Sequence, residues 1–377
     1  DSNDNLLVID RSHYRIRRID PKSGQVETVA GNGVKLFAGD GGPATGATLS
    51  FPHGMSVDKK DNLIFSDKGH FRIRKIALDG IINTIGGNGL RGNVGDNIPA
   101  LEANFYNVTT IVQNPKGDMF MASPSGFVSL IRRFDSKGII HDFIDTANPK
   151  YREAISNSKY KGLVQKGAVA TITQFSDIVF DPNGNLFTSD RLNHQIRKID
   201  TEGNVSTIAG TGDSDHYGDN GPALEAAFRD PNALASDSEG NIYIADTANN
   251  LIRKIDTNGI VTTFAGNGEH SDSGDGGPAL KASIRSMDDI EFNPAGELHI
   301  LGTNTHKVRK ITKDGKIMTV AGKGYAGFFG DGGSATKAML QNPAAISFDS
   351  KGNMYIADMG NNRIRKVDDQ GVITTFA

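Results

Sequence analysis

The segment Asn241-Ile-Tyr-Ile-Ala-Asp246, followed by Asn250-Leu-Ile-Arg-Lys-Ile255, decides the fold because its last four residues recur along the chain. Related tetrapeptides, hydrophobic at both ends and basic in the middle, begin at Ile16, Ile73, Ile131, Ile196, Ile252, Val308 and Ile364. The intervals between successive copies are 57, 58, 65, 56, 56 and 56 residues. A nearly fixed period of this length is typical of repeat folds, and the one long interval indicates an insertion in the third repeat.

Each period contains four short runs that are typical of β-strands. In the last copy these runs begin at Ala345, Asn353, Arg363 and Val372. They are rich in β-branched and aromatic residues, and Gly, Asn or Asp residues separate them, as in strands joined by tight turns. Four antiparallel strands repeated along a chain predict the blades of an all-β fold, the β-propeller.

The number of runs predicts the number of blades. The first run of the repeat occurs six times, whereas the other three runs occur seven times. We therefore predict seven four-stranded antiparallel blades, of which the first lacks its inner strand. A six-bladed propeller with surplus strands is the alternative. We expect residues 1–377 to form a single domain with an insertion at 145–174.

Composition excludes several classes of protein. The 377 residues include no cysteine, which excludes disulfides, thiolate metal sites and a cysteine nucleophile. A formal net charge of −3 argues against a nucleic-acid partner, because such binding needs clustered Lys and Arg. No apolar run approaches the roughly 18 residues of a membrane helix, so we expect no membrane insertion.

The repeat resembles the NHL repeat, a family named for an Asn-His-Leu tripeptide. The resemblance lies in Asn193-His194-Gln195-Ile196-Arg197-Lys198-Ile199-Asp200 with the preceding Gly184–Asp190, and equally in 241–253. It covers nearly the whole chain outside the insertion and implies a β-propeller. It does not imply one function, because propellers of this kind have many roles.

Two residue types recur within the repeat and predict structural roles. An Asp that ends the second strand, as in Asp246, accompanies the Arg of the third strand, as in Arg253. Carboxylate and guanidinium on neighbouring strands form strong paired hydrogen bonds. Ser123 and Gly302 replace this Asp in the third and sixth blades, which makes those blades candidates for divergence. Four histidines before the third strand are expected to be turn residues at one repeat position: His13, His70, His194 and His306.

The inner strands carry the candidate binding residues. Alignment of these strands places polar side chains at two adjacent positions where strands of a propeller converge on its axis. The predicted binding residues are His53, Thr109, Ser176, Asp177, Asn232, Asp288 and Asp289. Asn232 and four others offer the oxygen or imidazole donors that a divalent cation such as Ca²⁺ accepts, and these four are the predicted metal ligands: His53, Asp177, Asp288 and Asp289. No cofactor is assured by these residues, and no catalytic residue is predicted.

The insertion supplies a second candidate surface. It contains a basic stretch with two tyrosines, and long loops on a rigid scaffold often carry function. The candidate contact residues are Lys150, Tyr151, Arg152, Tyr160 and Lys161. A solvated cover over one face is the alternative.

These observations favour a non-catalytic binding or scaffolding propeller that recognises a protein or glycan partner through its loop faces. The alternative is a hydrolase or lyase that uses a divalent metal on the axis, since propeller lactonases and the peptide-amidating lyase are similar to NHL rings. The chain begins and ends within the repeat, so we expect a segment of a longer multidomain protein. The Gly-Asp-Gly-Gly-Pro-Ala linkers resemble those of exported bacterial NHL-repeat proteins, so we expect an extracellular, cell-surface or periplasmic location.

Overall fold

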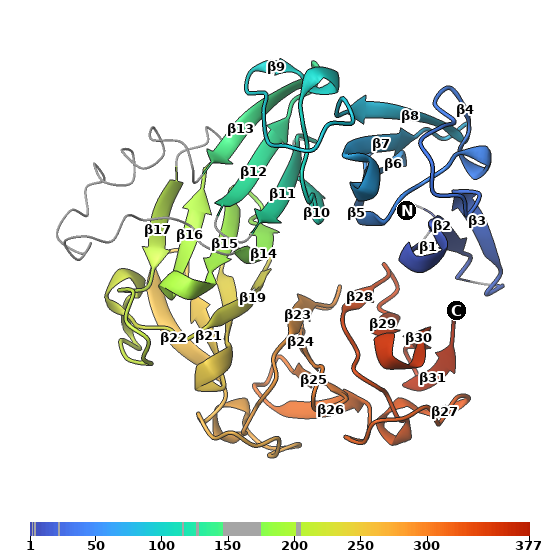
Figure 1. Ribbon diagram of the computed structural model, residues 1–377. Helices are drawn as coiled ribbons and strands as arrows, with labels where there is room; N and C mark the ends of the chain where they lie inside the picture. The colour runs from blue at the N-terminus through green and yellow to red at the C-terminus, as the bar shows by residue number, and fades with distance from the viewer. Residues whose placement is uncertain are drawn as a thin grey trace. The chain divides into compact units, whose positions relative to one another are not determined.

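The computed structural model describes residues 1, 3, 5–21, 23–114, 117–125, 128–145, 175–200 and 205–377. They form seven antiparallel β-sheets (Figure 1), which confirms the seven-bladed β-propeller and its three-stranded first blade. The six-bladed alternative is wrong. The described residues divide into two compact units, 1–145 and 175–377. That residues 1–377 form a single domain stays a prediction, and the insertion lies outside the described residues except for Asp145.

The first unit contains blades 1 to 3. Blade 1 consists of β1 (Leu6–Asp10), β2 (Arg15–Ile19) and β3 (Val26–Ala30). Blade 2 consists of β5 (Pro52–Val57), β6 (Leu63–Asp67), β7 (Arg72–Ile76) and β8 (Ile81–Gly86). Blade 3 consists of β10 (Thr110–Gln113), β11 (Met119–Ser125), β12 (Val128–Phe134) and β13 (Ile139–Asp145). Two short linker strands, β4 (Gly42–Pro43) and β9 (Ile98–Pro99), pair with the outer edges of β8 and β13.

The second unit contains blades 4 to 7. Blade 4 consists of β14 (Phe175–Phe180), β15 (Leu186–Asp190), β16 (Gln195–Ile199) and β17 (Val205–Ala209). Blade 5 consists of β19 (Pro231–Ser236), β20 (Ile242–Asp246), β21 (Leu251–Ile255) and β22 (Ile260–Ala265). Blade 6 consists of β23 (Asp289–Phe292), β24 (Leu298–Gly302), β25 (Lys307–Ile311) and β26 (Ile317–Ala321). Blade 7 consists of β28 (Ile346–Phe348), β29 (Met354–Asp358), β30 (Arg363–Val367) and β31 (Val372–Thr375). Linker strands β18 (Gly221–Pro222) and β27 (Gly333–Ser334) pair with β22 and β31.

Short 3₁₀ turns occupy two places in the repeat. Between the second and third strands lie η1 (Arg11–His13), η3 (Lys68–His70), η5 (Arg191–Asn193), η7 (Thr247–Asn249) and η10 (Met359–Asn361). In the linkers lie η2 (Ala44–Gly46), η4 (Ala100–Glu102), η6 (Ala223–Glu225), η8 (Ala279–Lys281) and η9 (Ala335–Lys337). The first set forms one face of each unit and positions the site described below.

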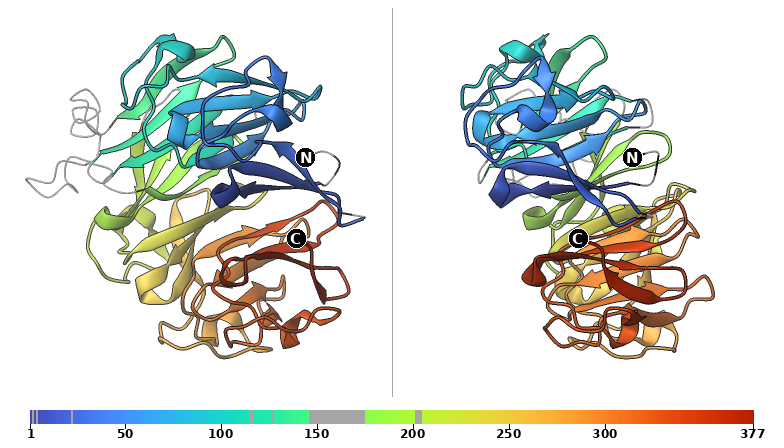
Figure 2. Two further views of the ribbon diagram at one scale, coloured as in Figure 1. Left: turned by 45° about the vertical axis from the view of Figure 1, so that its right-hand side comes forward. Right: turned by 90° about the vertical axis from the view of Figure 1, so that its right-hand side faces the viewer.

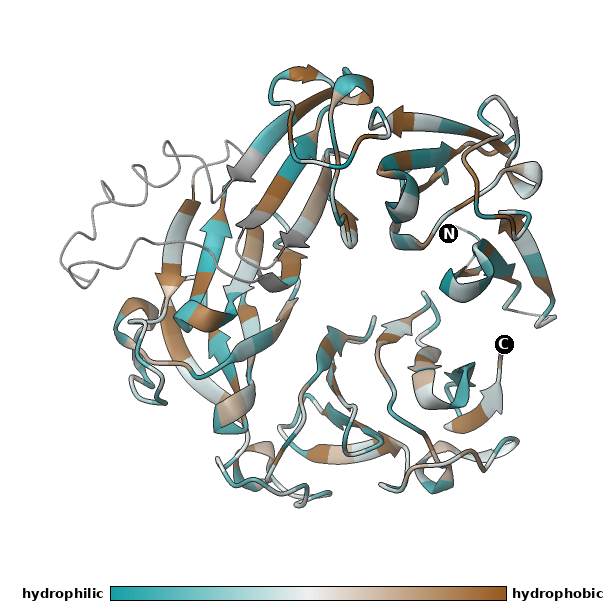
Figure 3. Cartoon of the chain, in the orientation of Figure 1, coloured by the Kyte–Doolittle hydropathy of each residue, from teal (hydrophilic) through white to brown (hydrophobic). Residues whose placement is uncertain are grey.

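Apolar side chains hold neighbouring blades together within each unit. Figure 3 shows hydrophobic residues along the strands, and Figure 2 gives two further views of the sheets. Each buried cluster draws its residues from two consecutive blades, as where Ala245 and Ile252 of blade 5 join Ile290 and Ile300 of blade 6. Equivalent clusters join blades 1 and 2, 2 and 3, 4 and 5, and 6 and 7. A four-stranded sheet cannot bury its faces alone, so stacking against the next blade supplies the core.

The third-strand arginines of blades 2 to 7 are buried, and several make more contacts than the sequence predicts. Arg253 forms an ion pair with Asp246 at 3.6 Å, as expected. Its Nη2 also donates to Asp219 of the preceding linker at 2.7 Å, and its Nη1 donates to the carbonyl of Ala227 at 3.3 Å. The arrangement repeats in Arg74, Arg309 and Arg365, each paired with a linker Asp 34 residues earlier: Asp40, Asp275 and Asp331.

Blades 3 and 6 keep the pairing with different acids. Arg132 bonds Asp142 of the adjacent strand at 2.7 Å, where Ser123 replaces the usual Asp. Arg309 bonds Asp272 of the linker at 3.0 Å, where Gly302 replaces it. Both departures from the repeat are therefore compensated in structural terms.

The turn histidines also make structural contacts, but they occupy two different positions in the repeat. The prediction of one shared position is therefore wrong. His13 and His70 end η1 and η3 and contact the strand-two Asp, as His70 Nδ1 contacts Asp67 at 2.9 Å. His194 and His306 lie one position later, with φ of 55° and 54°. The Nδ1 of His194 accepts a hydrogen bond from the backbone of Asp230 at 3.3 Å. The structural role expected for these residues is confirmed.

We predict that Arg253→Ala lowers the free energy of unfolding by about 3 kcal/mol, because it leaves the buried Asp246 carboxylate without its ion-pair partner. The exposed Arg18, which pairs with Glu27, is the matched control, and its change to Ala should cost less than about 1 kcal/mol. Urea unfolding followed by circular dichroism measures both variants. Equal midpoints for the two variants would contradict a framework role for the buried arginines.

Candidate functional site

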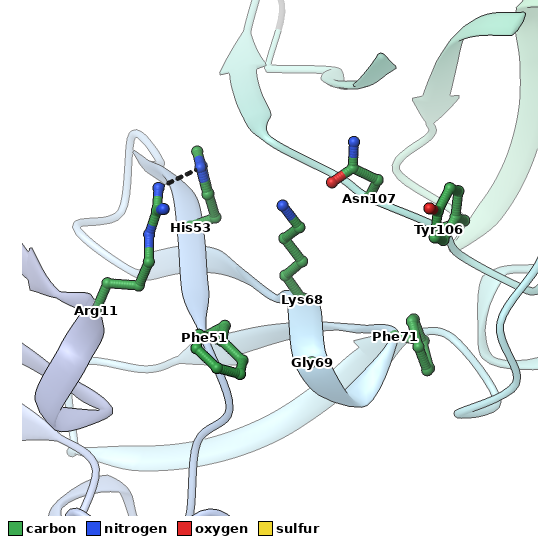
Figure 4. Close-up of a pocket in the computed structure, with 8 residues that line it drawn as sticks. All are labelled: Arg11, Phe51, His53, Lys68, Gly69, Phe71, Tyr106 and Asn107. Atoms are coloured by element: carbon green, nitrogen blue, oxygen red, sulfur yellow. Dashed lines mark hydrogen bonds between the residues drawn. The ribbon is translucent and has the colours of Figure 1, made fainter. Parts of the chain in front are cut away.

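A pocket of about 250 Å³ opens on the turn face of the first unit, between loops of blades 1, 2 and 3 (Figure 4). Its lining comes from η1, the start of β5, η3 and the segment before β10. Three of the lining side chains are basic: Arg11, His53 and Lys68. The remaining residues are Phe51, Gly69, Phe71, Tyr106 and Asn107, so aromatic rings surround the basic groups and no carboxylate lines the pocket.

Arg11 and His53 determine the protonation of the pocket. The Nη2 of Arg11 lies 2.5 Å from the Nε2 of His53, and Arg can only donate, so this Nε2 accepts. The Nδ1 of His53 then carries the proton and donates to the carbonyl of Thr109 at 2.9 Å. Burial and the charge of Arg11 lower the pKa of His53, with a further contribution from Lys68. His53 is therefore neutral at neutral pH, and Arg11 and Lys68 carry the positive charge of the pocket.

The aromatic side of the pocket depends on Phe51. Its φ of 47° lies in the left-handed region, which a bulky residue rarely adopts. The ring packs edge-on against Tyr14 with centroids 5.4 Å apart, and the ammonium of Lys35 lies 4.6 Å from the centroid of Phe51. Phe51 is 40% exposed, so part of its side chain is accessible to a ligand.

A second pocket, of about 400 Å³, lies at the equivalent place between blades 5 and 6 of the second unit. Thr247 there takes the repeat position of Lys68, and Arg285 takes that of Tyr106. Asp288 lines this pocket and accepts hydrogen bonds from the backbone of Thr303 at 2.9 Å and from Ser286 at 2.6 Å. The same place in the repeat therefore has different chemistry in the two units.

The predicted inner-strand carboxylates of the second unit brace adjacent blades. Asp177 Oδ2 accepts the backbone N–H of Leu234 in the next inner strand at 2.8 Å. Asp289 Oδ2 accepts the N–H of Ile346 in the same way at 2.9 Å. The carbonyl of Asn232 accepts a hydrogen bond from Ser189 at 2.7 Å. These contacts join blade 4 to blade 5 and blade 6 to blade 7.

Burial changes the acidity of three inner-strand carboxyl groups. It raises the pKa of Asp177 to about 6, and the nearby Asp289 adds to this increase. Burial likewise raises the pKa of Asp289. Glu291 lies two residues beyond Asp289 on the same side of β23, and burial together with the Asp289 charge raises its pKa to about 8. The second unit therefore carries a row of carboxyl groups that hold protons more strongly than usual.

Comparison with known proteins shows which proteins this chain resembles. A family model described as the Teneurin NHL domain matches residues 211–275 and 324–377. This match and the seven-bladed fold support an NHL-repeat β-propeller family. It is 28% identical to Teneurin-m of Drosophila melanogaster over 253 residues, which covers 60% of the chain and 9% of that protein. It is 27% identical to SUPPRESSOR OF QUENCHING 1, chloroplastic, of Arabidopsis thaliana over 265 residues, which covers 67% of the chain and 24% of that protein.

Among solved structures, virginiamycin B lyase from Staphylococcus aureus has the same fold, with a TM-score of 0.52 and 17% identity. The match covers 86% of this chain and 83% of the lyase. Identity at this level shows shared architecture and no more. The NHL chain spans less than a quarter of each of the two longer relatives, so the activities of those whole proteins do not transfer with the match.

The sequence-predicted residues are divided between the two units. His53 and Thr109 meet in the first unit, whereas Asp177, Asn232, Asp288 and Asp289 belong to the second. Ser176 lies in β14, but its side chain is outside the description, as are Lys150, Tyr151, Arg152, Tyr160 and Lys161. Within the described ranges, no group of three or more His, Asp or Glu side chains is arranged to hold a metal. The divalent-cation site stays a prediction.

Sequence reasoning found His53 but missed Arg11 and Lys68 beside it. The sequence did contain a sign of these residues, because both directly follow the Asp that ends the second strand. Other blades have Arg191, Thr247, Thr303 and Met359 at this position.

In the part of the chain that the structure describes, no helix has the length and apolar character needed to cross a membrane.

We predict that Glu291→Gln raises the thermal stability at pH 8 and leaves it nearly unchanged at pH 4. The folded-state pKa of about 8 lies above the ordinary 4.5, so the unfolded chain releases this proton first as the pH rises. Glu291 therefore lowers stability progressively between about pH 4.5 and pH 8, and a neutral Gln removes that loss. Calorimetric melting temperatures across this range measure the effect.

Glu297 is the matched control for this experiment. Burial raises its pKa, but hydrogen bonds from Lys310, at 2.9 Å, and Asn293 bring the pKa below its usual value. Glu297→Gln should therefore lower the melting temperature at pH 8. The same sign for both variants at pH 8 would show that Glu291 is not held protonated by its surroundings.

Proposed function

We propose that this chain is a non-catalytic binding domain of a longer, exported or cell-surface protein, and that it recognises a protein or glycan partner through the turn face of its first unit. The observation that carries the proposal is the pocket in which Arg11 and Lys68 lie among aromatic rings without a carboxylate. Arginine and tyrosine are among the residues enriched in binding hot spots. Arginine and tyrosine are also enriched at interfaces relative to the rest of a protein surface.

The contacts of the other polar residues support binding over catalysis. A general base needs a free lone pair near the substrate proton. The acceptor nitrogen of His53 receives Arg11, and its other nitrogen donates to Thr109. Oxygens of Asp177 and Asp289 accept backbone hydrogen bonds between blades. These groups therefore already make structural hydrogen bonds within the protein.

The length of the relatives supports a role as one part of a larger chain. Teneurin-m matches this chain over 9% of its length, so an NHL propeller of this type occurs there within a much longer protein. A rigid propeller whose loops vary between blades presents a broad surface, and binding residues commonly lie on such loops.

The metal-dependent hydrolase or lyase remains the second hypothesis because virginiamycin B lyase shares the fold. That likeness concerns architecture alone. The hypothesis requires His53 to act as a base or metal ligand, and it predicts turnover that depends on His53.

The test uses the purified 377-residue chain on arrays of glycans and of extracellular protein domains. We predict saturable binding that Lys68→Thr weakens at least ten-fold, because a positive charge is lost where blade 5 has Thr247. Lys313→Thr, on an exposed turn of blade 6, is the control and should bind as the unchanged chain does. Binding equally strong in both variants would place recognition elsewhere. Metal-dependent lactone turnover that His53→Ala abolishes would instead favour the hydrolase.

A further inference from the structure

The turn of blade 4 that is equivalent to η1 contains an arginine with an acidic partner, which the pocket of the first unit lacks. Arg191 has the same repeat position as Arg11, since each directly follows the strand-two Asp. The Nη2 of Arg191 donates to Oδ2 of Asp230 in the next blade at 2.8 Å, and its Nε donates to the other carboxylate oxygen. This arginine is therefore neutralised by an acid that the adjacent blade supplies.

Phe51 occupies the position of Asp230 in the blade that follows Arg11. Both residues precede the proline that begins the inner strand, and both have left-handed backbone, with φ of 47° for Phe51 and 57° for Asp230. Asn107 holds the same position next to Lys68. The two cations of the pocket thus face a phenyl ring and an amide where blade 5 places the carboxylate of Asp230 beside Arg191.

Among the described residues, no other acid takes the place that Asp230 has beside Arg191. Within the described ranges, neither Arg11 nor Lys68 forms an ion pair with an Asp or Glu. The adjacent carboxylates are engaged elsewhere: Asp10 contacts His13 and Arg17, and Asp67 contacts His70 and Arg74. The charge of Arg11, after burial, lowers the pKa of Lys68, so the two positive groups act on each other.

We propose that this pocket binds an anionic sugar residue of an acidic glycan, with its carboxylate or sulfate between Arg11 and Lys68 and its ring against Phe51 and Tyr106. The inference rests on the proposed function and names its ligand. Figure 4 shows the end groups of Arg11 and Lys68 on the same side of the pocket as the amide of Asn107.

Size and chemistry favour a single sugar residue. The volume of about 250 Å³ is below the range of about 300–1,000 Å³ that drug-sized ligands occupy. An anion supplies the acceptors that the guanidinium and ammonium need, in bonds stronger than neutral ones. Aromatic rings offer an apolar surface to the ring of the sugar, and the Asn107 amide can both donate to and accept from its hydroxyl groups.

The decisive variant is Phe51→Asp, which rebuilds within the pocket the acid that Arg191 already has. Aspartate tolerates the left-handed backbone better than phenylalanine does, and Asp230 adopts it at the same position, so this variant should fold. Arg191→Gln is the matched control, because it removes an arginine from the same repeat position that already has an acidic partner.

The experiment titrates the full 377-residue chain with glucuronic acid, glucose 6-sulfate and glucose at low ionic strength, with calorimetry or ligand-observed NMR as the readout. We expect glucuronic acid, glucose 6-sulfate or both to bind at least ten-fold more tightly than glucose, and the tighter of the two anions identifies the anionic group. Phe51→Asp should weaken that binding at least ten-fold, Arg191→Gln should not change it, and added salt should weaken it by screening.

Three results would overturn the inference: equal affinity for glucose and both anions, anion binding that persists in Phe51→Asp, or binding of an acidic peptide at this pocket without binding of either anionic sugar. The last result would leave the proposed binding function intact and change only the ligand. Failure of the proposed function is separate, since it would appear as an absence of any Lys68-dependent partner on the arrays.

Discussion

The buried guanidinium of the third strand is the constraint on which the rest of this propeller depends. Arginine does not lose its proton in proteins, so burying it is costly unless hydrogen-bonding partners surround it. Arg365 obtains them from Asp331 at 2.6 Å and from the carbonyl of Met339 at 3.2 Å, with Asp358 at 3.4 Å. These partners belong to the linker, to the segment after it and to the second strand. One side chain therefore fixes the path of the linker relative to its blade.

The same requirement explains why the repeat tolerates changes in sequence. Arg309 lacks the strand-two Asp because Gly302 stands there, yet Asp272 of the linker reaches it. Arg132 is served by Asp142 from the strand on its other side. The position of the acid varies, while the arginine keeps a carboxylate in every blade. The repeat is maintained by the charge balance of its buried groups more than by the identity of any one residue.

This distinction sets how much could be predicted from the sequence. The strands, the blade number and the pairing of Asp246 with Arg253 follow from local periodicity, since hairpin partners are seven residues apart. The pairing of Arg253 with Asp219 spans 34 residues and depends on the course of a glycine-rich linker, which periodicity does not describe. Gly266 illustrates the difficulty: its φ is 96°, and a Cβ there would lie 2.4 Å from the carbonyl oxygen of Asn250.

The candidate site was partly predictable for the same reason. His53 was found because aligned inner strands are a local pattern, and its contact with Thr109 confirms that adjacent inner strands meet. Arg11 and Lys68 were missed because each follows a structural Asp and looks like part of the turn. The raised pKa of Glu291, about 8, depends on burial by blades that the sequence does not place.

Comparison of equivalent positions in the repeat also shows where blade 2 differs from blade 5. At the position where Asp230 neutralises Arg191, Phe51 leaves Arg11 without an acid and holds a bulky side chain at a φ of 47°. An aromatic residue in left-handed backbone costs stability, and the absence of an acid leaves the charge of Arg11 unpaired by a carboxylate. Local rules of this kind are broken mainly at functional sites, where another gain offsets the cost. The two departures coincide at one residue, and together they leave the cations and rings of the pocket open to solvent.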